Sequence, residues 1–363
     1  MQTIINIIVF LLILGSIIII HELGHFLAAK FFGVYCGQFS IGFGPKLWSK
    51  KGKETEYEIR ALPFGGFVAM AGEEDQADNE DMQDLPVERT LKGIKTYQKV
   101  IIFLAGVFMN FVLAFVVTLG VNVFAGQLPV NVAQIGQIEA NSPAAQYGLE
   151  KDDVIQQIQI VETGESILVS NFEDVHLTQD TLKTKANTLN MKITVLRDNQ
   201  KKVIDMKVPY NVEASRYSLG IQQATRDMNI AEAFQYTFIS LKSMSVAIFA
   251  ALGQLVTKFS ETVTQLSGPA GIYQITAQVT ETGQIAYVLN LLALLSVNIG
   301  IFNLMPIPGL DGCQVLFAIV EKMICRELPE KLKLTLQMIG LGLVLLLMVF
   351  VTYQDILLSL IHI

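Results

Sequence analysis

Charged residues are scarce in this chain of 363 residues. Lys, Arg, Asp and Glu together make up 16% of it, and 52% of its residues are apolar. Soluble domains carry about 25% charged residues, so this composition favours a membrane protein. The net charge of -7 argues against a nucleic-acid partner, because phosphate binding requires a basic surface.

Cysteine is also scarce. Cys36, Cys313 and Cys325 are too few and too widely spaced for a disulfide framework or a Cys-x-x-Cys metal site. Cysteine usage therefore gives no information about the redox compartment.

Long apolar runs are what the sequence has in abundance. The runs 4–29, 100–125, 285–305 and 333–352 are each about 20 residues or longer, enough to cross the hydrocarbon core as a helix. A fifth stretch, 230–260, has Glu232, Lys242 and Lys258 among its apolar residues. It predicts an amphipathic helix on the membrane surface, with a true span as the alternative.

The distribution of lysine and arginine predicts the orientation in the membrane. The loops 30–99 and 321–333 are rich in both residues, whereas the segments before residue 4 and after residue 352 have neither. Basic loops stay on the cytoplasmic side. We therefore expect a multi-pass protein of the plasma membrane, with both termini and the insert 126–225 outside the cytoplasm.

Two regions between the spans carry strand patterns. Residues 56–60 alternate polar and apolar, and glycines flank them, which predicts a β-hairpin or small sheet within 34–72. In the polar insert, short apolar strands are expected at 132–138, 154–160, 191–197 and 203–208. Ser142 and Pro143 can start a short helix there, and Gly148 can end it.

The motif with chemical content is His21-Glu22-Leu23-Gly24-His25 in the first apolar run. Residues four apart share one face of a helix, so His21 and His25 can bind one metal ion, with Glu22 beside them as a general base. Zinc is the expected metal. The 17 steps from Ile4 to His21 cover about 25 Å of helix, which places the motif in the cytoplasmic third of the bilayer. The alternative is a structural His–Glu cluster between helices.

A third ligand is expected at Asp311. His176 lies in the polar insert and His362 at the far terminus, so neither is a good candidate. Asp311 follows Pro306 and Pro308 at the cytoplasmic end of the 285–305 run, at the predicted depth of the histidines. Irregular backbone at that depth is tolerated only when it is buried in protein or lines a wet cavity, as a hydrolase site requires. The alternative for Asp311 is a helix cap.

The His-Glu-x-x-His motif in the first run, followed by Asn303-Leu304-Met305-Pro306-Ile307-Pro308-Gly309-Leu310-Asp311-Gly312, resembles the site-2 protease family. The chain looks most like its bacterial branch with one PDZ domain. Further matches are residues 39–45 and 58–68 to a membrane re-entrant β-region, Ala105-Gly106 and Asn110-Phe111 to the second span, and Ser142 to Leu149 to the PDZ domain. Cys313 and Phe108 depart from the family pattern.

This resemblance implies a polytopic α-helical membrane protein with four transmembrane helices, a re-entrant β-sheet and one extracytoplasmic PDZ domain. Its parts would be 1–126 with the first two spans, 127–222 as the PDZ domain, and 223–363 with the amphipathic helix and the last two spans. The implied function is that of an intramembrane zinc endopeptidase in regulated intramembrane proteolysis. Substrates would be transmembrane segments of single-span partners, such as anti-sigma factors or signal-peptide remnants, trimmed first by a site-1 protease.

Carried over to this sequence, the family implies one zinc ion per chain held by His21, His25 and Asp311, with Glu22 as general base. The implied substrate contacts are Asn303, Pro306, Asn110, Gly65 and Gly66. For Asn110, packing against a neighbouring helix is an equal alternative.

Two other classes of function are the alternatives. A PDZ-bearing membrane adaptor with a decayed catalytic site would not need the intact His21, Glu22, His25 and Asp311. A transporter would be expected to carry paired ionisable groups near the midplane and internal repeats, and neither is evident in the sequence. Bound zinc at about one ion per chain would disfavour both.

Overall fold

The computed structural model describes residues 1–73, 85–175, 187–211, 216–258 and 268–361. The chain divides into two compact units. Unit 1 contains Met1–Phe124 and Ala231–Ile363, and unit 2 contains Ala125–Ile230.

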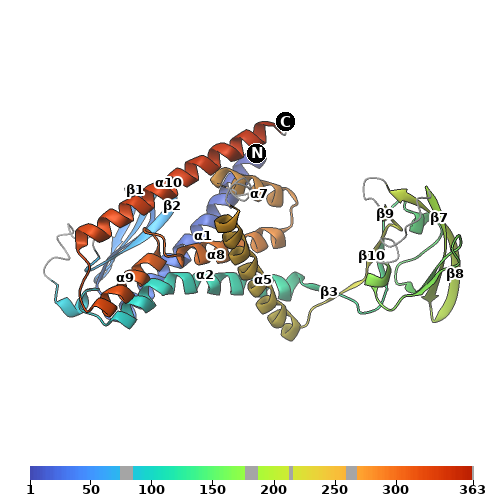
Figure 1. The fold of residues 1–363 in the computed structure, drawn as a ribbon, viewed down its shortest axis with the longest axis horizontal. Coiled ribbons are helices and arrows are strands. Elements are labelled where there is room, and N and C mark those ends of the chain that lie inside the picture. The colour runs from blue at the N-terminus through green and yellow to red at the C-terminus, as the bar shows by residue number, and fades with distance from the viewer. Residues whose placement is uncertain (74–84, 176–186, 212–215, 259–267, 362–363) are drawn as a thin grey trace. The chain divides into compact units, whose positions relative to one another are not determined.

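Unit 1 is mainly helical (Figure 1). Its elements are α1 (Gln2–Phe31), β1 (Cys36–Lys51), β2 (Glu56–Met70), η3 (Val87–Arg89), α2 (Thr96–Ala125), α5 (Ile230–Thr257), α7 (Pro269–Glu281), α8 (Ile285–Asn303), α9 (Asp311–Ile324) and α10 (Glu330–Ile361). The four apolar runs of the sequence are confirmed as the helices α1, α2, α8 and α10. The site lies among these helices and the hairpin formed by β1 and β2.

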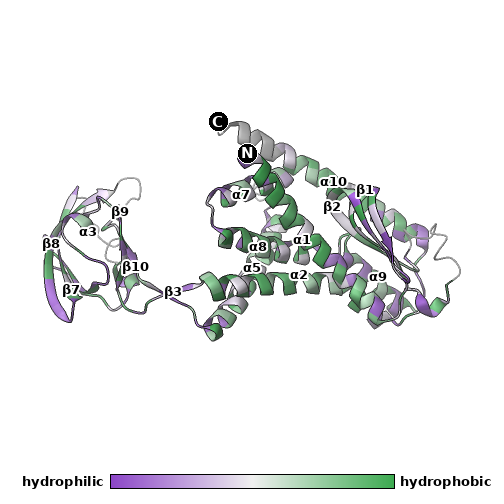
Figure 2. Ribbon diagram, turned by 180° about the vertical axis from the view of Figure 1, so that it is seen from behind, coloured by the Kyte–Doolittle hydropathy of each residue, from purple (hydrophilic) through white to green (hydrophobic). Residues whose placement is uncertain are grey.

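Five described helices are long and apolar enough to cross a membrane: α1, α2, α8, α10 and also α5. Figure 2 shows the apolar colouring along their length. The protein is therefore polytopic. The stretch 230–260, predicted as a surface helix, contains the helix α5 (Ile230–Thr257), whose Phe234 and Phe238 pack on Phe115 of α2.

The predicted hairpin is confirmed, and its pairing is more elaborate than the sequence indicated. Ile41 of β1 pairs with Ile59 and also with Gly66, because β2 bends back and flanks the first half of β1 on both sides. Val68 and Met70 then pack with Phe39 and with Ala29 of α1 in one buried cluster. The last part of β2, residues 66–70, is thereby an edge of the sheet that faces the end of α1.

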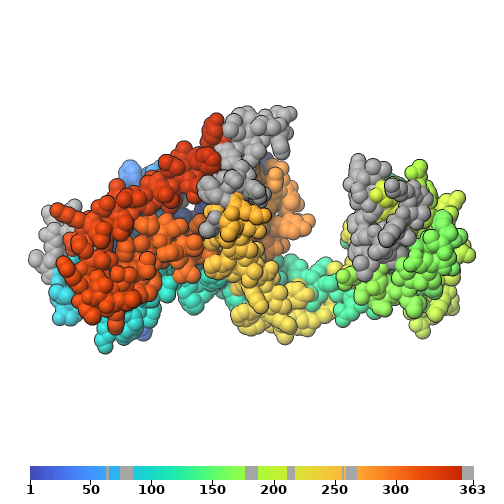
Figure 3. Space-filling view, in the orientation of Figure 1, coloured from blue at the N-terminus to red at the C-terminus, as the bar shows by residue number. Residues whose placement is uncertain are grey.

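The helical structure is interrupted between α8 and α9. Leu304 ends α8, and Pro306 and Pro308 keep the following segment out of a helix until Asp311 begins α9. α10 packs directly on this segment, since a Cβ at Gly340 would overlap the carbonyl of Pro308. Figure 3 shows the red surface of α10 adjoining the orange surface of this region.

The predicted loop 321–333 is only partly a loop. α9 continues to Ile324 and α10 begins at Glu330. An ion pair between Glu321 and Lys333, 2.8 Å apart, joins the two helices across the remaining turn. Charge patterning marked this segment as polar but did not show that its two ends belong to helices.

Unit 2 is an antiparallel β domain. Its elements are β3 (Gln127–Pro129), β4 (Ile135–Ile138), α3 (Pro143–Gln146), β5 (Val154–Ile160), β6 (Ser166–Leu168), β7 (Thr188–Arg197), β8 (Gln200–Asn211), β9 (Arg216–Tyr217), β10 (Ile221–Gln223) and β11 (Thr225–Asp227). The main sheet has the order β6-β5-β7-β8-β9. All four predicted strands are present, and Ser142 caps α3 by accepting a hydrogen bond from the Ala145 amide.

Candidate active site

The two histidines of the motif lie on one buried face of α1. His21 is 8% exposed and His25 is 5% exposed, and their Nε2 atoms are 3.2 Å apart. The helix positions them four residues apart, one above the other, as the spacing predicted.

Asp311 completes a cluster with them. Its Oδ2 atom lies 3.0 Å from His21 Nε2 and 3.3 Å from His25 Nε2. This carboxylate belongs to the first turn of α9, directly after the irregular segment that contains Pro306 and Pro308. α8 ends just before that segment, close to the two histidines. Among the described residues, these three are the one group of His, Cys, Asp or Glu side chains close enough to hold a metal ion together.

The cluster fits a tetrahedral metal ion. Ligands about 2.0–2.1 Å from a tetrahedral zinc ion lie about 3.3 Å from one another, close to the three separations found here. Asp311 Oδ2 is buried and has no hydrogen-bond partner in the described structure, as expected of an atom that a metal would satisfy. Two histidines and one carboxylate leave a fourth position open.

The helix α2 covers the histidines from one side. His25 Nδ1 lies 2.8 Å from the carbonyl oxygen of Ile102. A Cβ at Gly106 would overlap His25 Nε2, so only glycine permits this approach of the two helices. Asn110 is fully buried, and its Nδ2 lies 3.3 Å from His21 Nδ1.

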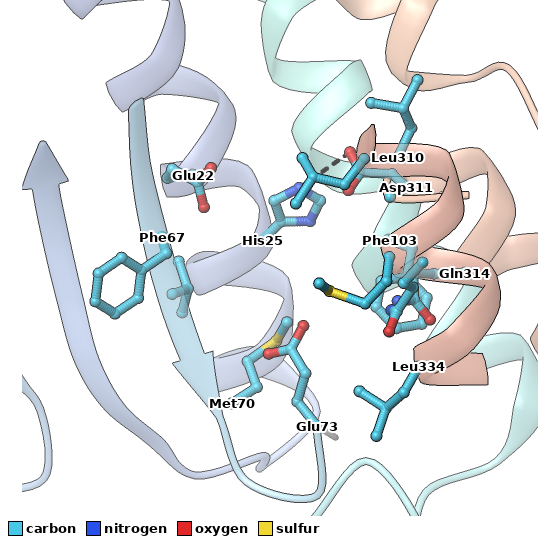
Figure 4. A pocket seen from close by; sticks show the side chains of 15 residues that line it. Glu22, His25, Phe67, Met70, Glu73, Phe103, Leu310, Asp311, Gln314 and Leu334 are labelled. Carbon is cyan, nitrogen blue, oxygen red and sulfur yellow. Dashed lines mark ion pairs between the residues drawn. The ribbon is translucent and has the colours of Figure 1, made fainter. Parts of the chain in front are cut away.

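Glu22 faces a cavity of about 300 Å³ beside the cluster (Figure 4). His25 and Asp311 line the same cavity, together with Phe67 and Val68 of β2. Figure 4 shows the Glu22 carboxylate and the His25 ring on one side of the space and α9 on the other. The Glu22 carboxylate, two of the three predicted metal ligands and an edge strand therefore meet around one space large enough for part of a peptide.

The predicted substrate contacts lie at different positions around this site. Asn303 Nδ2 is 3.4 Å from His21 Nε2, and Pro306 is exposed in the break between α8 and α9. A Cβ at Gly66 would come 3.2 Å from Glu22 Cγ. Gly65 has a φ of +83°, a conformation that favours glycine, and a Cβ there would overlap Phe43. His176 and His362 lie outside the described residues.

Several residues of the site were not found from the sequence. Gln314 of α9 and Gln337 of α10 line the cavity, and Gln337 Oε1 is buried without a hydrogen-bond partner in the described structure. A glutamine within an apolar run is a signal that could have identified Gln337. The Ile102 carbonyl could not have been found, because a backbone acceptor leaves no mark in the sequence.

Comparison with known proteins gives the same family throughout the chain. The model of peptidase family M50 matches residues 9–347. A Clostridium perfringens protein with zinc metalloprotease in its name is 33% identical over 351 residues, which cover 95% of this chain and 97% of the relative.

Two Bacillus proteins are similar over a comparable share. The regulator of sigma-W protease RasP of Bacillus subtilis and the zinc metalloprotease RasP of Bacillus licheniformis are each 30% identical, over 97% of this chain and 98% of the relative. With two buried histidines and a partly buried aspartate clustered beside a glutamate on polytopic helices, and a family match from residue 9 to 347, the chain belongs to peptidase family M50, the zinc-dependent metalloproteases known as site-2 proteases.

Proposed function

We propose that this protein is an intramembrane zinc endopeptidase that cleaves membrane-embedded segments of partner proteins. The observation that carries the proposal is the convergence of His21 Nε2, His25 Nε2 and Asp311 Oδ2 beside Glu22 and a cavity. His21, His25 and Asp311 would hold one zinc ion. When bound there, zinc supplies a Lewis acid for the scissile carbonyl and makes water a better nucleophile at neutral pH.

Glu22 would act as the general base. Its carboxylate faces the cavity from the turn of α1 that carries the histidines. It would take a proton from the attacking water and pass it to the leaving amine. Replacing a general base of this kind costs about 10²- to 10⁴-fold in rate.

The substrate would bind in an extended form along β2. A helix hides its peptide bonds, so a membrane segment must unwind before hydrolysis. Residues 66–70 form a sheet edge beside the cavity, and strand addition to such an edge would hold an unwound segment by its backbone. Gly65 and Gly66 shape this edge, and Asn303 and Pro306 would contact the unwound backbone from the α8–α9 side.

The proposed topology has four spans, α1, α2, α8 and α10, with the site near the cytoplasmic side. The contact of Asp311 with His21 and His25 supports it, because α8 must then end at the side of the membrane where α1 ends. The start of α8 would thus lie on the same side as the end of α2. The chain must therefore cross the membrane an even number of times, or not at all, between α2 and α8. A crossing by α5 alone would make this number odd, and α7, with 13 residues, is too short to add a second crossing. We therefore propose that α5, which runs across α2 in Figure 1, lies at the outer membrane surface and does not span the membrane.

Unit 2 would be an extracytoplasmic PDZ domain, a proposal supported by its antiparallel sheet with the short helix α3. It would act as a filter that admits single-span substrates already trimmed by a site-1 protease. Anti-sigma factors are one such class, in keeping with the name of the Bacillus subtilis relative. Deleting residues 127–222 should speed cleavage of untrimmed substrates, and an unchanged rate would reject the filter.

The decisive experiment is co-expression with a tagged, single-span model substrate already trimmed outside. The wild-type protein should cleave it, and Glu22→Gln should not, at equal abundance of both proteins. Equal cleavage by both would mean that another protease acts and that Glu22 is not the base.

A further inference from the structure

One face of α2 is built against the two histidines. Ile102, Gly106 and Asn110 follow one another at intervals of four residues, so they share a face of the helix. Ile102 presents its carbonyl to His25, Gly106 leaves room for both rings, and Asn110 reaches His21.

The contact with Ile102 fixes the orientation of His25. A carbonyl oxygen only accepts hydrogen bonds, so His25 Nδ1 must donate the bond of 2.8 Å. The lone pair of Nε2 is then free, and it points to the place where His21 Nε2 and Asp311 Oδ2 also meet. A metal-bound histidine normally donates its other ring N–H in this manner.

The same requirement applies to His21. Its Nε2 atom lies in the cluster, so its Nδ1 should carry hydrogen and needs an acceptor. The amide of Asn110 is the group within reach, 3.3 Å away, and its Oδ1 has no other hydrogen-bond partner in the described structure. The two ends of an amide have the same shape, so its orientation follows from its partners. His21 therefore selects the orientation in which Asn110 Oδ1 accepts its N–H.

The surroundings of Asn110 suit a fixed acceptor and not a substrate contact. The residue is 0% exposed and is not among those that line the cavity. The hydroxyl of Ser296 on α8 donates a bond of 2.8 Å to the backbone carbonyl of Asn110. Gly300, one turn further along α8, lies 3.4 Å from the Asn110 side chain when given a Cβ, so that helix closes the pocket around the amide.

We propose that Asn110 is a positioning residue of the metal site: it orients His21 as Ile102 orients His25, and it does not bind substrate. The proposal rests on the proposed function, because it assumes that His21 is a ligand. Its chemistry is that of an acceptor which fixes the ring and keeps the lone pair of Nε2 directed at the ion.

The test compares zinc retention by the purified full-length protein and three variants. Asn110→Leu removes the acceptor, and Asn110→Asp keeps it. Asn122→Leu is the matched control, since Asn122 also lies on α2 and donates a 3.0 Å bond to Thr237 Oγ1 on α5, more than three turns from Asn110. Zinc per folded, monodisperse protein is measured against a graded series of chelator concentrations.

We expect Asn110→Leu to lose zinc at about 10- to 100-fold lower chelator concentration than the wild type, as removal of such a partner does elsewhere. Asn122→Leu should match the wild type, and Asn110→Asp should stay close to it. Equal retention by Asn110→Leu and the wild type overturns the inference, as does a higher KM for a model substrate with zinc retention unchanged. If Asn110→Asp fails to fold, the comparison of Asn110→Leu with Asn122→Leu still tests the proposal. A wild type that holds no zinc would instead refute the proposed function itself.

Discussion

At the scale of single residues, glycine decides how closely the helices approach the metal cluster. A Cβ at Gly24 of α1 would overlap the carbonyl oxygen of Ala105, and one at Gly312 of α9 would overlap that of Leu304. Together with Gly106, these residues let three helices meet around Asp311 and the histidines without a side chain between them. Small residues at helix contacts serve this purpose in membranes generally.

Gly106→Ala should therefore disturb the site more than an ordinary helix substitution. Its Cβ would overlap His25 Nε2 and lie 2.7 Å from His21 Cε1. We expect a loss of stability of about 1–3 kcal/mol from overpacking, together with weaker zinc retention. Gly120→Ala on the same helix is the control, because nothing lies within 4 Å of its Cβ. Equal thermal unfolding and zinc content in the two variants would contradict the close approach.

Metal removal gives a second prediction at this scale. A ligand that binds only the folded protein stabilises it by about 2.7 kcal/mol at a hundredfold excess over Kd. Chelation should therefore lower the Tm of the wild type, and added zinc should restore it. Asp311→Ala should abolish this response, because it removes one of the three ligand atoms. A response that persists in Asp311→Ala would place the metal elsewhere.

At the scale of elements, ion pairs outside the membrane spans join the β1–β2 hairpin to α1 and η3. Glu54 in the turn between β1 and β2 accepts hydrogen bonds from Lys30 of α1, at 2.7 Å, and from Arg89 of η3, at 2.8 Å. These two bonds lower the pKa of Glu54 from its ordinary value of 4.5. The turn, the end of α1 and the segment before α2 are thus tied at one point.

This pairing predicts a pH dependence. Because the pKa of Glu54 is lower in the folded state, the pairing stabilises the protein above the unfolded pKa and is lost as the pH falls through the folded pKa. Glu54→Gln should lower stability at pH 7 by at most about 1 kcal/mol, since the side chains are partly exposed and screened. The Tm difference from the wild type should close at low pH and shrink in high salt. A difference that persists at low pH would mean that packing, and not charge, joins these elements.

At the scale of the whole molecule, the proposed orientation depends on the parity of the crossings. The protein offers a native probe of it, since Cys325 after α9 is exposed whereas Cys36 and Cys313 are buried. The proposal places Cys325 on the cytoplasmic side and unit 2 on the opposite side. The same assignment keeps α5 out of the count of spans.

A membrane-impermeant maleimide should therefore label Cys325 in inverted vesicles and not in intact cells. The control is Lys201→Cys at the exposed start of β8 in unit 2, combined with Cys325→Ser. It should show the reverse pattern. Labelling of both Cys325 and the unit 2 cysteine from outside intact cells would overturn the topology, because it requires an odd number of crossings between α2 and α8. Labelling of Cys325 from outside, with the unit 2 cysteine protected, would mean that the whole protein is inverted.

The sequence by itself determined the features that depend on local chemistry. Long apolar runs must form helices in lipid, because backbone polar groups find no other partners there. The spacing of His21 and His25 places them on one helix face, and short apolar segments separated by Gly, Asn and Asp predict the strands of unit 2. The proposed ligand Asp311 was also found from the sequence, because a carboxylate in a broken apolar segment is costly unless it is used.

Only the tertiary structure decided what depends on contacts between distant segments. Three features follow from packing that leaves no periodic pattern in the sequence. They are the pairing of β1 with β2 on both sides, the contact of α10 with the segment between α8 and α9, and the short helices α7 and α9. The same holds for Asn110. The sequence left open whether it contacts substrate or a neighbouring helix, because burial and distance to His21 arise only when α1, α2 and α8 pack together.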